Sequence, residues 1–118
     1  TVTQTFFAAA RSDRDATRES EFLYLDAIMN SEESSESAKT SAQEQKMQLV
    51  NRMEKELALE TLIKGRGFED AIVTIGDKGI SIVVGQSELT EEQANQILSV
   101  VVAETTFKPT EVKVIPFN

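Results

Sequence analysis

The 118-residue sequence contains no cysteine and no histidine. Without cysteine the chain has no disulfide, no zinc–thiolate site and no thiol nucleophile. Without histidine, general acid–base chemistry near neutral pH would have to come from carboxylates, lysines or the single tyrosine, Tyr24. No apolar run approaches the roughly 20 residues that a helix needs to span a bilayer. These absences argue against most classes of enzyme.

Positive charge is also scarce and is not clustered. Twelve lysines and arginines stand against 20 aspartates and glutamates, and the net charge of −8 is spread over both halves of the chain. Nucleic acids and anionic membrane surfaces are bound by clustered Lys and Arg, so neither is expected as a partner. The acidic residues predict no site either. Glu91 and Glu92 fall in the first turn of a predicted helix, where acids complement the helix dipole, and we expect no metal and no cofactor.

Residues 1–30 are predicted to form a helical extension, because residues 5–29 contain neither proline nor glycine. Its middle, residues 11–21 (RSDRDATRESE), holds one small apolar residue, Ala16, between two apolar clusters. Pairs such as Arg11–Asp15 and Arg18–Glu21 have the spacing for ion pairs along one helix. This pattern predicts a solvated stretch of helix with no core face.

Residues 31–40 are rich in serine and glutamate and predict a connector, after which residues 41–118 form a compact domain. Ser41 and Glu44 have capping-box spacing and predict the start of a second helix that runs to Lys64. Gly65 and Gly67 then end it. The apolar positions on this helix recur every three or four residues and predict its core face: Met47, Val50, Met53, Leu57, Ala58 and Leu62.

The remaining segments predict two strands, a helix and a third strand. Residues 71–75 and 80–84 are β-branched runs around a Gly-Asp-Lys-Gly turn, which indicates a hairpin. Thr90 and Gln93 have capping-box spacing at the start of an amphipathic helix. Residues 111–115 form the last strand, which we expect Pro116 to end.

The order helix–strand–strand–helix–strand predicts an α+β fold with a three-stranded sheet in the order 3-1-2 and both helices on one face. The first strand would then be central, and residues 80–84 and 112–117 would be open edges. Open edges carry unpaired backbone groups that proteins either protect or use for binding. The candidate partner surface is the last strand together with one face of the early helix: Val112, Lys113, Val114, Ile115, Phe117, Arg14, Arg18 and Phe22.

The run MEKELALETLIKGRGFEDAIV, residues 53–73, resembles the stage III sporulation protein AH family of endospore-forming bacteria. The hairpin, the Glu-Glu-Gln-Ala helix and the strand after Phe107-Lys-Pro continue this likeness over most of residues 20–118. The resemblance implies a ring-building-motif fold, similar to that of basal-body ring proteins of type III secretion. It also implies an interaction domain that is not an enzyme.

The family resemblance further implies a location and a partner. Family members are anchored in the outer forespore membrane, on the mother-cell side, by one transmembrane helix, which we expect before Thr1, so that residues 1–30 would be a juxtamembrane stalk. Their soluble domain faces the space between mother cell and forespore and binds stage II sporulation protein Q. This contact zips the membranes during engulfment and contributes to a ring or channel. The alternative is a homo-oligomeric ring subunit of a secretion-like apparatus with a purely structural role.

Overall fold

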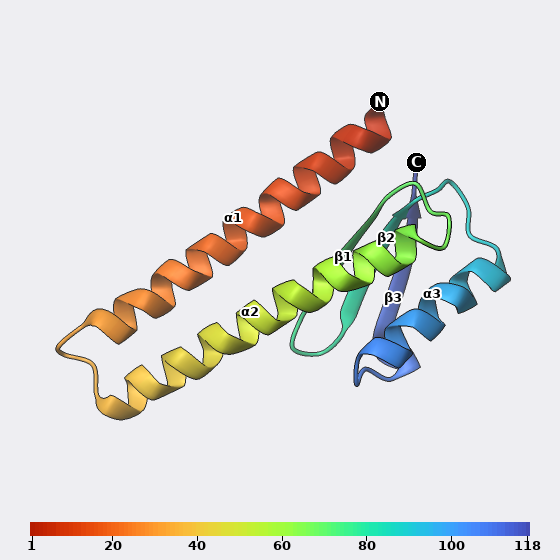
Figure 1. Cartoon of the computed structure of the whole chain (residues 1–118). Coiled ribbons are helices and arrows are strands. Elements are labelled where there is room, and N and C mark those ends of the chain that lie inside the picture. The colour runs from red at the N-terminus through yellow and green to blue at the C-terminus, as the bar shows by residue number, and fades with distance from the viewer.

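A computed structural model describes residues 1–118 and places a long antiparallel pair of helices beside a small sheet with one further helix (Figure 1). The helix pair reaches well past the sheet, so the molecule is elongated, with extents of 54 × 32 × 20 Å. The elements in chain order are α1 (Val2–Asn30), α2 (Glu36–Lys64), β1 (Ala71–Ile75), β2 (Ile80–Gly85), α3 (Glu91–Glu104), a 3₁₀ turn (Pro109–Glu111) and β3 (Val112–Phe117).

Local signals set most of the helix ends. The predicted capping box of Thr90 and Gln93 begins α3, and Gly67 takes a positive φ of 103° just after α2. The start of α2 differs from the prediction. Ser35 accepts a hydrogen bond from the Ala38 N–H and caps the helix, which therefore begins before Ser41.

The sheet has the order β1-β2-β3, so the predicted order 3-1-2 is wrong. β2 is central, antiparallel to β1 and parallel to β3, and residues 80–84 are therefore not an open edge. The physical reason is that the outer side of β1 is already hydrogen-bonded by side chains of α1 and α2, so β3 pairs with the free side of β2. The prediction that residues 112–117 form an edge is confirmed, although β3 continues through Pro116.

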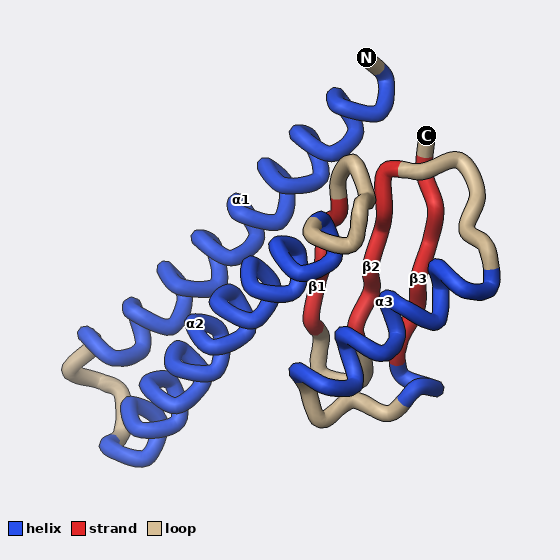
Figure 2. Tube along the Cα trace, turned by 45° about the vertical axis from the view of Figure 1, so that its right-hand side comes forward, coloured by secondary structure: helices blue, strands red, loops and turns tan.

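One face of the sheet is covered by α2 and α3, as predicted, and Figure 2 shows α3 lying in front of the strands. Alternate residues of β1 and β2 point into this layer, as period-two strands require. The buried core consists of twelve side chains: Leu59, Ile63, Phe68, Ala71, Val73, Ile75, Ile80, Ile82, Val84, Ile97, Val100 and Val101.

The core face predicted for α2 is wrong. Four of its apolar residues are exposed: Met47, Val50, Leu57 and Leu62. The buried positions instead recur every seven residues, at Ala42, Leu49, Glu56 and Ile63, with Leu59 and Glu60 beside them. Two of these residues are glutamates, so the apolar pattern alone indicates a different side of the helix from the one that packs.

The absence of a core face in the middle of α1 is also a wrong prediction. Arg18 is 7% exposed, and α1 contacts the rest of the molecule at both ends and in between. At its N-terminal end the ring of Phe7 is buried where a side chain on Gly85 would point, and the ring of Phe6 stacks on that of Phe117 with centroids 3.9 Å apart. At the far end the core of the helix pair is Leu25 with Ala42 and Leu49.

Candidate functional site

The outer edge of β1 is closed by side chains rather than by another strand. An arginine from α1 and a carboxylate together bind both backbone groups of one strand residue, and we call each such unit an edge clamp. At Val73, Arg14 Nη1 donates to the carbonyl oxygen at 2.7 Å, and Glu60 Oε2 accepts from the N–H at 2.9 Å. Arg14 and Glu60 are themselves joined at 2.6 Å, so the clamp supplies the donor and the acceptor that a neighbouring strand would.

Three residues of β1 are clamped in this way, Ala71, Val73 and Ile75, and the clamp at Ile75 is the most buried. Glu56 Oε2 accepts from the Ile75 N–H at 2.7 Å, and Arg18 Nη2 lies 3.3 Å from the Ile75 carbonyl oxygen. Arg18 and Glu56 are joined at 2.8 Å, and the Glu56 side chain is 1% exposed. Charges this deeply buried are tolerated only when they are paired and hydrogen-bonded. No buried side-chain nitrogen or oxygen in the chain lacks a hydrogen-bond partner.

The clamp at Ala71 is the most open. Arg11 Nη2 donates to the Ala71 carbonyl oxygen at 2.7 Å, and Asp70 accepts from the Ala71 N–H at 2.8 Å. Arg11 also binds Asp70 through two parallel hydrogen bonds of 2.7 and 3.1 Å. The bonds that the guanidinium donates and the carboxylate accepts lower the pKa of Asp70 and raise the pKa of Arg11.

Helix and strand spacings are compatible across the three clamps. The seven residues from Arg11 to Arg18 advance about 10.5 Å along a helix, while the four from Ala71 to Ile75 advance about 13 Å along a strand. The difference of about 3 Å is within the reach of long arginine side chains. Residue numbers rise together in the two elements, so α1 runs parallel to β1, and α2 runs antiparallel to both.

The opposite edge of the sheet, β3, has no such cover. In a strand, the backbone groups of alternate residues point to opposite sides. The clamped residues of β1 are odd-numbered and point outward, so the register directs the even-numbered residues of β2 toward β3. A residue in a parallel pair bonds to the two neighbours of its partner, so β3 bonds to β2 through its odd-numbered residues. Its even-numbered residues, Val112, Val114 and Pro116, turn their backbone groups to the outer edge.

Val114 is the residue of β3 that offers both backbone groups to a partner. The Val112 N–H already donates to the Pro109 carbonyl oxygen, and Pro116 has no N–H. Val114 takes part in none of the backbone hydrogen bonds that lie outside helices and strands. An incoming strand could therefore exchange a pair of hydrogen bonds at Val114 and add donors to the carbonyls of Val112 and Pro116.

The structure places the five predicted strand residues on both faces of β3. Val112 and Val114 are half-buried against the core, and Lys113 and Ile115 are exposed on the other face. Phe117 points to that same face and is covered by Phe6 of α1. These residues do lie together at the open edge, as a strand partner would require.

The three predicted residues of α1 lie elsewhere. Arg14 and Arg18 are turned into the clamps, and Phe22 is half-buried beside the core of the helix pair, with the Lys46 ammonium 5.9 Å from its ring centre. The partners that sequence reasoning missed are the carboxylates Glu56 and Glu60. Their four-residue spacing and their place between apolar residues of α2 are consistent with a buried face, but a carboxylate is interpreted as exposed unless a cation is known to face it.

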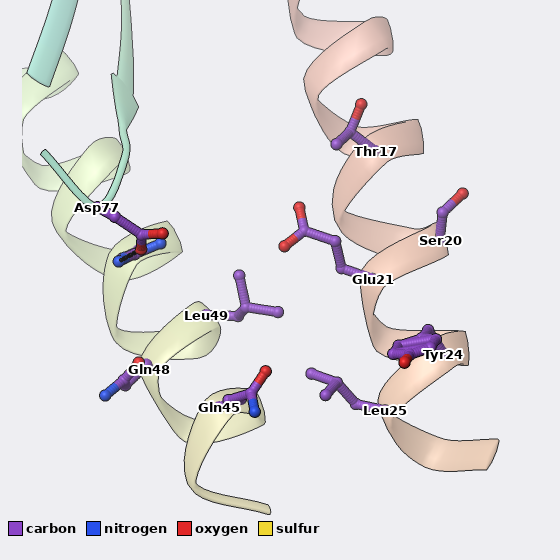
Figure 3. A pocket seen from close by; sticks show the side chains of 10 residues that line it. Thr17, Ser20, Glu21, Tyr24, Leu25, Gln45, Gln48, Leu49 and Asp77 are labelled. Carbon is purple, nitrogen blue, oxygen red and sulfur yellow. Dashed lines mark hydrogen bonds and ion pairs between the residues drawn. The ribbon is translucent and has the colours of Figure 1, made fainter. Parts of the chain in front are cut away.

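A groove of about 440 Å³ lies between the two long helices, next to the β1–β2 turn (Figure 3). Leu25 and Leu49 point toward one another across it, and Asp77, paired with Arg52, lies at one end. The hydrogen bond from Arg52 lowers the pKa of Asp77, which is an exposed carboxylate. The hydroxyl groups that line the groove make no hydrogen bond to a carboxylate, so we assign the groove no chemistry.

The structure has neither a carboxylate cluster suited to a metal ion nor a helix suited to crossing a membrane. No group of three or more aspartate or glutamate side chains lies close enough together to bind a metal ion. None of the helices combines the length and the hydrophobicity that crossing a membrane requires.

Comparison with known proteins identifies the family of the chain. The model of the SpoIIIAH-like protein family matches residues 1–114. The chain belongs to the SpoIIIAH-like family. Stage III sporulation protein AH of Bacillus subtilis (strain 168) is 31% identical over 120 residues, which cover 94% of this chain and 55% of that protein. The chain thus spans about half the length of this curated relative.

The fold of this SpoIIIAH-like chain is shared with a solved structure. A chain of the SpoIIQ–SpoIIIAH pore-forming complex superposes on it with a TM-score of 0.85 and 29% sequence identity. The match covers 94% of this chain and 96% of the solved one, so it includes both long helices as well as the sheet. The family resemblance found in the sequence is therefore confirmed.

Proposed function

We propose that this SpoIIIAH-like chain is a non-enzymatic interaction module that binds stage II sporulation protein Q. The observation that carries the proposal is the open edge of β3, where the backbone N–H and C=O of Val114 are free to pair with a strand of another protein. The likeness to a chain of the SpoIIQ–SpoIIIAH complex supports the choice of partner.

Family membership also supports a proposed cellular setting. The module would belong to a protein of the mother-cell membrane and would face the space between mother cell and forespore. There it would hold the two membranes together during engulfment and form part of a ring or channel. Residues 1–30, which include α1, would be the part nearest the membrane, and β3 would be the contact strand. The connector would be residues 31–35 rather than 31–40, because α2 begins at Glu36.

The β3 edge has the features of a strand-binding surface. Backbone hydrogen bonds provide affinity in such pairing, and side chains on the two faces provide specificity. Lys113 and Ile115 project from the exposed face next to the edge, and they offer a partner one charge and one apolar contact. Pro116 limits pairing on its side, because no donor is present there.

The decisive measurement is calorimetric titration of the chain with the ectodomain of stage II sporulation protein Q. Wild type is expected to bind stoichiometrically without added metal or nucleotide. Val114→Pro removes the one free donor of the edge and is expected to weaken binding by at least about tenfold, equivalent to about 1.4 kcal/mol. Lys113, which precedes it, is already extended, as a residue before proline prefers.

The matched control is Val114→Ala, which trims the same side chain but keeps the N–H. It is expected to bind within a few-fold of wild type. Charge reversal by Lys113→Glu tests the neighbouring side chain and is expected to weaken binding. If Val114→Pro and Val114→Ala bind equally well, the partner does not pair with β3. An absence of heat with wild type, together with no comigration of the two proteins, would exclude the proposed partner.

Sedimentation separates this proposal from a purely structural ring subunit. An interaction module is expected to remain monomeric alone over a wide concentration range and to form a complex of defined mass with its partner. A ring subunit would increase in mass with its own concentration, without any partner.

A further inference from the structure

We propose that α1 acts as a built-in cover for one edge of the sheet, so that the domain accepts a partner strand at β3 and not at β1. Both edge strands carry outward backbone groups, and an uncovered edge pairs readily with other chains. At β1 the outward groups of Ala71, Val73 and Ile75 are all bonded by the edge clamps. At β3 those of Val114 are not.

The clamps occupy the same hydrogen-bonding groups that an added strand would use. A strand contributes one donor and one acceptor to every second residue of its neighbour. Each clamp supplies one arginine N–H and one carboxylate oxygen to one strand residue, and the two are joined by an ion pair of 2.6 to 2.8 Å. A competing strand would have to displace the largely buried arginines and glutamates of the Val73 and Ile75 clamps from the backbone groups that they bond, which is unfavourable.

The cover makes the domain one-sided. If both edges were open, β1 of one copy could pair with β3 of the next, and such a head-to-tail contact can repeat without limit. Closing the edge of β1 prevents this repeated pairing between copies and leaves the edge of β3 for a partner. Because the clamps act at β1, the inference does not depend on which protein pairs with β3.

Hydrogen exchange of the wild-type chain is the first test. The N–H groups of Val73 and Ile75 face away from β2, yet they are bonded to Glu60 and Glu56. After correction for intrinsic rates, both are expected to exchange at least about tenfold more slowly than the outward N–H of Val114. Exchange of Val73 and Ile75 as fast as Val114 would overturn the proposal.

The second test opens the edge. Arg14→Gln with Arg18→Gln removes two clamp cations but keeps long polar side chains. The folded double variant is expected to self-associate in sedimentation at concentrations where wild type does not, and exchange at Val73 and Ile75 should accelerate at least about tenfold. Asp13→Asn with Asp15→Asn, on the exposed side of the same helix segment, is the control and should behave as wild type.

Adding Val114→Pro to the clamp variant identifies how the copies join. Loss of association would show β1 pairing with β3 of another copy, and persistence would show β1 pairing with β1. Either result supports the inference. A folded clamp variant that keeps the wild-type mass and exchange rates would refute it, and if that variant does not fold, the wild-type exchange rates alone decide.

Discussion

Replacement of Glu56 by leucine is the most informative perturbation of the clamps. Glu56→Leu keeps most of the side-chain volume but removes the acceptor for the Ile75 N–H and the partner of the buried Arg18 cation. Removing one member of a buried ion pair costs about 3–5 kcal/mol, because the other charge stays buried and uncompensated. Folded domains are stable by only about 5–15 kcal/mol, so this is a large fraction of the total.

The expected shift in melting temperature follows from the size of the chain. At about 2.1 cal/mol/K per residue, unfolding 118 residues has an entropy of about 0.25 kcal/mol/K. A loss of 3–5 kcal/mol therefore lowers the midpoint by about 12–20 °C. Thermal unfolding followed by circular dichroism, with urea titration at 25 °C, measures both quantities. The control is Glu54→Leu, an exposed position on the same helix, which should change stability by less than about 0.5 kcal/mol.

A double variant separates the ion pair from the capping of the strand. Arg18→Met with Glu56→Leu removes both charges. Replacing a buried ion pair by apolar residues often leaves the stability unchanged when the two side chains bond only to each other. Here both backbone groups of Ile75 would lose their partners, so a cost of about 1–3 kcal/mol should remain. If the double variant is as stable as wild type, or if Glu56→Leu costs no more than Glu54→Leu, the edge-clamp reasoning is refuted.

Three other predictions follow from single sites. Gly79→Ala should destabilise by about 1–3 kcal/mol in urea titration, because its Cβ would lie 2.6 Å from the Glu111 carbonyl oxygen, whereas Gly76→Ala, with its nearest contact at 3.7 Å, should cost less than about 1 kcal/mol. Asp70 has a folded-state pKa below its ordinary value of 3.8, so its carboxylate stabilises the fold above pH 3.8, and this stabilisation is lost as the pH falls through the folded pKa. The difference in unfolding free energy between wild type and Asp70→Asn should therefore shrink below about pH 4. Phe7→Ala should lower stability by about 3–5 kcal/mol in the same urea assay, and a loss under 1 kcal/mol would show that the N-terminal end of α1 does not dock.

Sequence patterns predicted the elements better than their faces. The hairpin, the capped start of α3 and the end of α2 at its glycines depend on turn and cap residues that act within a few positions. The order of the strands depends instead on contacts between residues about 60 positions apart, such as Arg11 with Ala71. No local pattern reports which edge of a hairpin is already occupied, so the third strand was placed on the wrong side.

Only part of the candidate site was predicted, again because local patterns do not report contacts between distant segments. The last strand was predicted to be an edge strand, and the strand order places β3 at the edge of the sheet. Its proline is consistent with an edge position. The arginines of α1 were predicted as surface residues, because a run with one small apolar residue resembles a solvated helix. Their buried partners, Glu56 and Glu60, lie on another helix and were not paired with them until the tertiary structure brought the two helices together.

The sequence by itself determined the α+β class, the succession of helices and strands, the family and the lack of thiol or imidazole chemistry, because composition and short-range pattern are enough for these. Only the tertiary structure decided which side of α2 is buried, which strand is central and which edge is open. Those outcomes depend on long-range pairing of charged side chains with the backbone of β1. Arg14 and Arg18 are stable inside the molecule only because each donates hydrogen bonds to a carboxylate and to a carbonyl oxygen of β1.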